Sequence, residues 1–242
     1  MPEQVAQSFG GVAADYDRVR PDWPPAAVDR AAELLGLTSE AEVVDLAAGT
    51  GKLTRLLAAR FARVVAVEPD ARMRAVLGAE GVEGTAERIP LPDRSVDAAF
   101  VGDAFHWFDA PVALAEIARV LRLRGGLALL WNQWWETDPP IPEAAAALLR
   151  EPYERSGRAA AVRHYDWRAA FAGSPFETPR EERLTGEAVV SSEELVALYR
   201  STSSIAALEE AAWQPMRKRL SELLRGTYRL PLTIDLVWTR LA

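Results

Sequence analysis

The sequence predicts an α/β fold with a doubly wound parallel sheet that is covered by helices on both faces. Short apolar runs of strand length alternate with segments of helical periodicity between residues 42 and 131, and this alternation is typical of parallel sheets with right-handed crossovers. The chain has 242 residues, of which 49% are hydrophobic and 26% charged. It can therefore bury a sizeable core as one large domain with an elaboration.

Strands and helices follow one another through the first half of the chain. A first helix begins at Pro24 and Pro25 and ends at Gly36, because proline suits a helical first turn and glycine ends helices. A later helix is expected to be capped by Asp109 and closed by Gly125 and Gly126. The other predicted elements are strands at 42–46, 63–68, 82–86, 96–102 and 127–131, and helices at 51–60 and from Asp70.

The last hundred residues are less regular, and we interpret 132–176, which carries several prolines, as a surface insert. A sixth strand is possible at 181–190. Ser191 and Glu194 have the spacing of a capping box before a short helix, and a later helix ends at Gly226. Strict alternation of apolar residues then predicts a final strand at 228–240.

Charge and composition limit the classes of function that the chain can have. The net charge of −7 disfavours nucleic acid and anionic membrane surfaces as partners. There is no cysteine, so a disulfide framework and a thiolate zinc site are impossible, and we assign no metal ligands. No run of about twenty apolar residues could span a bilayer, and the acidic first thirty residues are unlike a signal peptide. We therefore expect a cytoplasmic protein without membrane contact.

The stretch "VVDLAAGTGKLTRLL" at 43–57 passes from a strand through a turn of small residues into a helix. Gly49 and Gly51 allow backbone conformations and close approaches that larger side chains prevent. In open α/β sheets the ligand lies beyond the carboxyl ends of the strands, where this turn is. Glu68 ends the next strand 19 residues after Gly49, and a carboxylate there can accept both hydroxyl hydrogens of a ribose.

Two kinds of nucleotide-like ligand fit such a turn. A dinucleotide site needs a third glycine, but position 54 is Thr. Asp45 lies inside the strand just before the turn, where its carboxylate would repel a pyrophosphate and would suit a cation. These two residues favour a ligand with a cationic group over a dinucleotide.

Four segments together resemble class I S-adenosylmethionine-dependent methyltransferases, within the small-molecule group that carries the methyltransferase type 11 domain. They are "VVDLAAGTG", "VAVEPD", "GTAERIPLPDRSVDAAF" and "GDAFHWF", and the resemblance covers residues 8–132. It implies that Glu68 holds the ribose hydroxyls and that Asp45 fixes the loop and the cationic end of the cofactor. The other positions implied to contact the cofactor are Ala47, Gly49, Thr50 and Gly51 at methionine and ribose, Ala86 and Glu87 at adenine, and Pro69 and Asp103.

The resemblance also implies a seven-stranded sheet whose last strand is antiparallel to the others. It divides the single domain into an N-terminal lid and helix at 1–40, a cofactor-binding core at 41–132, an insert that shapes the acceptor pocket at 133–225, and the final strand at 226–242. Tyr16 and Arg20 are the lid residues expected at the cofactor; an exposed Arg20 is the alternative. Ala47 departs from the glycine often found there, and its backbone is expected to avoid φ values available only to glycine.

His106 follows the fourth strand at the end where an acceptor would meet the methyl group. A neutral imidazole there can take a proton near pH 7, so His106 is the candidate general base. The alternative is a structural histidine that shapes the pocket between Phe105 and Trp107. Trp131, Trp134 and Trp135 are expected either to form an aromatic wall of that pocket or to pack in the core.

We thus expect methyl transfer from S-adenosylmethionine to an O, N or C atom of a small organic acceptor, with S-adenosylhomocysteine as the product, by a monomer or homodimer. A non-catalytic protein of the same fold that binds an adenosyl ligand or a partner is one alternative. An NAD(P)-dependent oxidoreductase is another.

Overall fold

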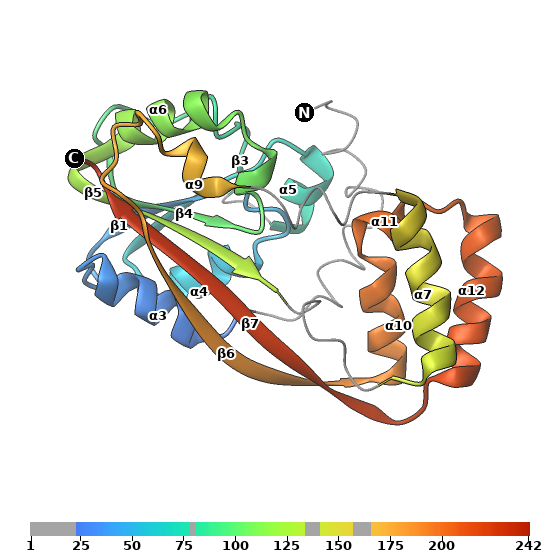
Figure 1. The fold of residues 1–242 in the computed structure, drawn as a ribbon. Helices are drawn as coiled ribbons and strands as arrows, with labels where there is room; N and C mark the ends of the chain where they lie inside the picture. Colours follow the sequence, from blue (N-terminus) through green and yellow to red (C-terminus); the bar gives the residue numbers. More distant parts are fainter. Residues whose placement is uncertain (1–22, 78–80, 134–140, 157–165) are drawn as a thin grey trace.

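A computed structural model describes residues 23–77, 81–133, 141–156 and 166–242 (Figure 1). Its seven-stranded sheet has the order β3-β2-β1-β4-β5-β7-β6. Tyr16, Arg20, Trp134 and Trp135 lie outside the described residues. The strands are β1 (Glu42–Leu46), β2 (Arg63–Val67), β3 (Gly81–Val82), β4 (Val96–Gly102), β5 (Leu121–Asn132), β6 (Arg180–Ser191) and β7 (Thr227–Arg240).

The strand directions confirm the predicted topology. Parallel pairs join β1 to β2 and β4, β2 to β3, and β4 to β5, whereas β7 is antiparallel to both β5 and β6. The chain order reverses between β1 and β4, so the crevice expected at such a switch point lies at the carboxyl ends of these two strands.

Helices cover both faces of the sheet, as the strand and helix alternation predicts. In Figure 1 α3 and α4 lie on one face of the sheet and α6 on the other. On the α4 face, Leu57 packs in a hydrophobic core with Phe100 of β4. On the α6 face, Ile117 packs in another core with Val101 of β4. Among the described residues, no helix combines the length and the apolar character needed to cross a bilayer. The helices are α3 (Pro25–Leu34), α4 (Lys52–Arg60), α5 (Ala71–Leu77), η2 (Phe105–Trp107), α6 (Ala110–Val120), α7 (Glu143–Ser156), α9 (Trp167–Ala170), α10 (Ser192–Arg200), α11 (Ser203–Ala206) and α12 (Glu210–Leu223).

A separate helical unit of α7, α10, α11 and α12 packs where β6 ends and its antiparallel neighbour β7 begins (Figure 1). The last pair between β5 and β7 joins Asn132 to Ile234, and β7 continues beyond it paired with β6 alone. Leu230 and Leu232 in this extension belong to the core of the helical unit, whereas Ile234 belongs to the core beside α3. The helical unit therefore lies beyond the carboxyl end of β5.

Three local predictions need correction. The helix from Asp109 ends at Val120 and not at the glycine pair, because the chain enters β5 at Leu121 and pairs irregularly with β4 before Gly126. Asp109 occupies the N-cap, but its side chain makes no capping hydrogen bond. The strand predicted at 82–86 is only Gly81–Val82, because the chain then turns back on itself, with an isolated bridge between residues 85 and 88.

The second half follows its predictions more closely. β6 and β7 match the expected strands to within one residue at each end. The predicted capping box is present: the Ser191 hydroxyl accepts from the Glu194 N–H, and the Glu194 carboxylate accepts from the Ser191 N–H. The final strand predicted from the alternating apolar residues is confirmed as β7, and it runs antiparallel to β5 as expected.

Candidate functional site

The turn between β1 and α4 forms one wall of the crevice. Gly49 has φ 59°, and Gly51, the N-cap of α4, has φ 86°. A Cβ added at Gly49 would meet no atom of the described residues within 4 Å, so these residues leave the space above the turn open. Glycine at these two positions supports left-handed backbone and leaves room for a ligand close to the main chain.

Ala47 adopts a left-handed backbone conformation. Its φ is 55°, in the small left-handed region that L-residues can enter, so this value does not contradict the expectation that Ala47 avoids φ values available only to glycine. A non-glycine residue adopts this conformation at a cost of about 1–2 kcal/mol. The small side chain therefore does not spare the turn this strain.

Glu68 links the two loops at the ends of β1 and β2. Its carboxylate accepts from the Gly49 N–H and from the Asp70 N–H, each at 2.8 Å, and the residue is only 6% exposed. Burial raises the pKa of the Glu68 carboxyl, and these two hydrogen bonds oppose the rise. Beside it, Pro69 and Glu68 present backbone carbonyls to the Arg74 guanidinium, each at 2.7 Å, which holds the second loop against α5.

Asp45 lies beneath the turn and is 1% exposed. The Thr54 hydroxyl, one turn into α4, donates to its carboxylate at 2.6 Å. Burial is the main cause that raises the pKa of Asp45 to about 7, and the charge of Glu68 adds to the rise while Thr54 opposes it. In the sequence, Thr54 was considered only as the position where a dinucleotide site has glycine. Its place as a polar residue on the buried face of α4 was the available signal that it contacts the acid of the preceding strand.

At this edge of the sheet, the Thr50 hydroxyl in the β1–α4 turn and the Asn132 side-chain carbonyl at the end of β5 are buried oxygen atoms with no hydrogen-bond partner among the described residues. The two residues are 2% and 3% exposed. A buried polar atom without a partner costs about 1–3 kcal/mol. Such atoms are expected where a ligand supplies the missing partner, and sequence reasoning did not identify Asn132.

The carboxyl end of β4 adjoins that of β5. Asp103 has φ 51°; its N–H donates to the Leu130 carbonyl, and its carboxylate accepts from the Asn132 N–H, both at 2.8 Å. His106 follows on η2, half-buried, with its ring 4.5 Å from that of Trp107. The structure thus brings Asp103 and His106 to the same edge of the sheet as the two loops joined by Glu68.

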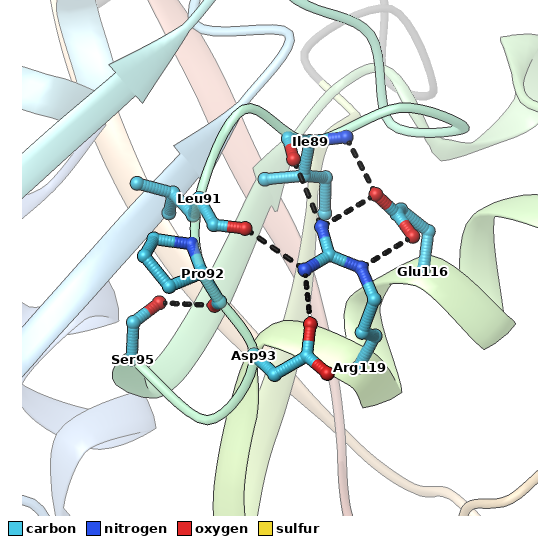
Figure 2. A network of polar contacts seen from close by, with 7 residues as sticks. All are labelled: Ile89, Leu91, Pro92, Asp93, Ser95, Glu116 and Arg119. Carbon is cyan, nitrogen blue, oxygen red and sulfur yellow. Dashed lines mark hydrogen bonds and ion pairs between the residues drawn. The ribbon is translucent and has the colours of Figure 1, made fainter.

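Ala86 and Glu87 lie in the loop that connects β3 to β4. Ala86 is buried, and the Glu87 carboxylate accepts from the Asp109 N–H at 2.9 Å. Farther along the loop, Arg119 and Glu116 of α6 hold Ile89, Leu91 and Asp93 in a network of polar contacts (Figure 2).

Trp131 packs mainly into the core on the α6 face. Its ring lies edge-on to Phe105, with centroids 6.5 Å apart, and stacks on Trp167 at 6.4 Å. Phe171 and Phe176 extend this aromatic cluster. For Trp131 the observed contacts agree with the core-packing alternative.

Comparison with known proteins finds methyltransferases among the relatives of this chain. A protein family described as "Methyltransferase domain" matches residues 44–129. A protein of Mycobacterium tuberculosis named as an uncharacterized methyltransferase is 48% identical over 133 residues, which are 53% of either chain, so the match spans about half the length of that relative. A protein of Schizosaccharomyces pombe with the same kind of name is 32% identical over 231 residues, covering 91% of this chain and 88% of its own.

Solved structures share the fold at lower identity. A protein from Anaeromyxobacter dehalogenans assigned as a type II methyltransferase aligns with a TM-score of 0.63 and 22% identity, over 92% of this chain and 98% of its own. The YcgJ protein from Bacillus subtilis aligns with a TM-score of 0.53 and 16% identity, over 89% and 97%.

Proposed function

We propose that this chain, which belongs to the class I methyltransferase family, transfers a methyl group from S-adenosylmethionine to an O, N or C atom of a small organic acceptor. The product would be S-adenosylhomocysteine. The family is established by the full-length relative from Schizosaccharomyces pombe. The choice of cofactor and acceptor rests on the chemistry of the crevice.

One observation carries the proposal: the Gly49 N–H at the glycine turn already donates to the Glu68 carboxylate. A pyrophosphate would have to compete with this anion for the same donor and would be repelled by it. Each carboxylate oxygen has a second acceptor position, so Glu68 can still accept from the two hydroxyls of a ribose. The crevice therefore suits an adenosyl group without phosphates.

The residues around the turn fit such a cofactor. Among the described residues, the space above Gly49 is open and the Thr50 hydroxyl has no hydrogen-bond partner. Both observations support contacts with the ribose and methionine parts from Ala47, Gly49, Thr50 and Gly51. Asp45 lies beneath them and favours a cation. In the proposed arrangement Pro69 lies next to the ribose-binding carboxylate that precedes it in the chain. Ala86 and Glu87 lie beside adenine, and Asp103 lies near the methionine end.

The acceptor would enter on the side of the crevice that has the carboxyl ends of β4 and β5 on one side and the helical unit next to β6 and β7 on the other. Bound S-adenosylmethionine supplies an electrophilic methyl group to an in-line displacement. The chain has to align the acceptor, and good alignment alone contributes roughly 7–11 kcal/mol. His106 is the group we assign to take a proton from a hydroxyl or ammonium acceptor, and Asn132 offers its carbonyl to a hydrogen on the acceptor.

Residues 1–40 would form the N-terminal lid and first helix, 41–132 the cofactor core, 133–225 the acceptor-side insert and 226–242 the closing strand. Trp23, the first described residue, supports this order: a Cβ added at Gly102, the end of β4, would lie 3.1 Å from its ring. Trp23 thus lies against the carboxyl end of β4. Tyr16 and Arg20 precede Trp23 by a few residues and remain our lid contacts to the cofactor.

Titration calorimetry tests the cofactor assignment directly. We expect saturable binding of S-adenosylmethionine and S-adenosylhomocysteine and no comparable binding of NADH or NADPH. Preference for a nicotinamide cofactor would overturn the proposal. Methyl transfer from labelled S-adenosylmethionine to compounds of an acceptor panel then tests turnover, and binding without transfer to any member would instead support a non-catalytic adenosyl-binding protein.

A further inference from the structure

We propose that Arg119 and Glu116 are positioning residues that set the loop between β3 and β4 so that it distinguishes adenine from other purines. The proposal rests on the function proposed above, because it concerns the loop that would lie beside the base. Neither residue has to touch the cofactor. They act on Ala86 and Glu87 through the rest of the loop.

The sheet does not fix this loop, since β3 consists of Gly81 and Val82 alone. An isolated bridge between Thr85 and Arg88 then turns the chain back on itself. The segment that carries Ala86 and Glu87 therefore lacks the ladder of hydrogen bonds that holds an ordinary strand in register. Its position has to come from contacts elsewhere.

Arg119 donates three hydrogen bonds to the loop, and the other two N–H bonds of its guanidinium go to Glu116. Nη2 donates to the Ile89 carbonyl at 3.0 Å, and Nη1 donates to the Leu91 carbonyl at 2.9 Å and to the Asp93 carboxylate at 2.7 Å. Nε and Nη2 also donate to the two oxygens of Glu116 at 2.8 and 2.7 Å. Figure 2 shows the planar fork between the loop and α6.

Glu116 completes the clamp by accepting from the Ile89 N–H at 3.0 Å. Both polar groups of Ile89 are thus held by α6, its N–H by Glu116 and its carbonyl by Arg119. The bidentate pair with Arg119 keeps the Glu116 carboxylate charged and oriented, and the same hydrogen bonds hold its pKa below the usual range. This pair fixes the loop at the third residue after Ala86.

The other end of the same helix holds Glu87, whose carboxylate accepts from the Asp109 N–H at the N-cap of α6. One helix therefore holds the loop at two points, Glu87 and Ile89. Displacement of the clamp would move Ala86 and Glu87 relative to the Glu68 carboxylate. An acceptor group in this loop would then no longer meet the 6-amino group of a base whose ribose is held at Glu68.

The experiment compares two ligands by calorimetry: S-adenosylhomocysteine and S-inosylhomocysteine, in which an oxygen replaces the 6-amino group. A loop that accepts a hydrogen bond from that amino group rejects the oxygen, so we expect the unchanged protein to prefer the adenine compound by about tenfold or more. In Arg119→Ala the preference should fall to within about threefold. Arg119→Lys should give an intermediate value, because an ammonium cannot form the bidentate fork.

Arg122→Ala is the matched control. Arg122 also pairs with two carboxylates, Glu42 at 2.8 Å and Asp97 at 2.7 Å, but it does so at the amino ends of the strands. We expect a similar loss of stability and no change in the adenine preference. Glu116→Gln, which keeps the shape of the side chain and loses its charge, provides a second test if Arg119→Ala does not fold.

Discrimination that stays unchanged in folded Arg119 and Glu116 variants would overturn the inference, as would equal binding of both compounds to the unchanged protein. An equal loss of preference in Arg122→Ala would also overturn it. Failure of the unchanged protein to bind either compound is a different result, since it would overturn the proposed function itself.

Discussion

The two edges of the parallel sheet treat their charged groups differently. At the amino edge Arg122 bridges Glu42 and Asp97, whose side chains are about a third exposed. At the carboxyl edge Asp45 and Glu68 are buried, and their carboxylates accept from a threonine hydroxyl and from backbone N–H groups. The amino edge is already satisfied by its own side chains, whereas the carboxyl edge keeps groups whose burial is costly.

Backbone strain does not separate the edges in the same way. Ala47 and Asp103 adopt left-handed conformations at the carboxyl edge, but Arg94 and Arg124 do so near the amino ends of β4 and β5. Buried polar side chains therefore distinguish the carboxyl edge, where the candidate site lies, better than backbone strain does. The following predictions test that contrast, from the largest expected effect to the smallest.

His106→Ala should lower the turnover of a hydroxyl or ammonium acceptor by roughly 10²- to 10⁴-fold, because it removes the assigned proton acceptor. Cofactor affinity should change little. His106→Gln is the matched variant, since it keeps a polar side chain that cannot take a proton near pH 7. Steady-state rates equal to those of the unchanged protein would exclude His106 as the base.

Asp45 should make stability depend on pH. Its pKa in the folded chain is about 7 against an ordinary value of 3.8, so the folded state holds the proton more tightly. The stabilising contribution is complete below about pH 4 and disappears as the pH rises through 7, by roughly 2–4 kcal/mol in total. Urea unfolding at pH 5 and pH 8 should show this loss in the unchanged protein and a much smaller one in Asp45→Asn; parallel behaviour of the two would contradict the assignment.

Glu68→Ala should weaken S-adenosylhomocysteine binding by about 10- to 150-fold, equivalent to roughly 1.5–3 kcal/mol for hydrogen bonds to a charged group. The change removes both the proposed ribose contact and the link between the Gly49 and Asp70 loops. Glu42→Ala removes a carboxylate from the opposite edge and should leave the affinity measured by calorimetry unchanged. Equal affinity in Glu68→Ala would remove the basis for placing the ribose there.

Asn132→Leu should raise the free energy of unfolding by about 1 kcal/mol, because it replaces a buried carbonyl that has no partner in the described residues with an apolar group of similar size. The same change should lower turnover if the acceptor supplies the missing hydrogen. Asn132→Asp, which adds a charge next to Asp103, should instead destabilise the chain. A less stable Asn132→Leu would mean that the carbonyl is satisfied in the folded protein.

Ala47→Gly should stabilise the chain by about 0.5 kcal/mol. Relief of left-handed strain, about 1–2 kcal/mol, is offset in part by the greater freedom of glycine in the unfolded state. Ala48→Gly is the control, since Ala48 is absent from the positive-φ residues and the change should only destabilise. Opposite signs in thermal unfolding would confirm the difference, and equal destabilisation would contradict it.

The fold was largely predictable because its signals are local. Val43 to Leu46 and Val96 to Gly102 are compact apolar runs, and both form central strands. The errors occur where contacts between distant residues decide the outcome. The helix predicted to reach Gly125 ends at Val120 instead, because Leu121 begins β5 and pairs with Val96 of β4.

The placement of part of the candidate site was predictable, because the ends of β1 and β2 define it. Gly49 and Gly51 follow the end of β1 and Glu68 follows the end of β2, and the structure brings Gly49 and Glu68 into contact. Arg119 and Thr54 were not found, because their roles depend on partners in other elements, at the loop from Ile89 to Asp93 and at Asp45. No pattern within α6 or α4 alone reveals those pairs.

The place of β7 also has a consequence for synthesis. β7 follows β6 along the chain but lies between β5 and β6 in the sheet, so neither neighbour can complete its pairing until the ribosome has released the later strand. Until then β5 presents an unpaired border, which is the kind of surface that nascent chains use for unwanted association. Growing chains halted after β6 should therefore need chaperone protection that the completed polypeptide does not.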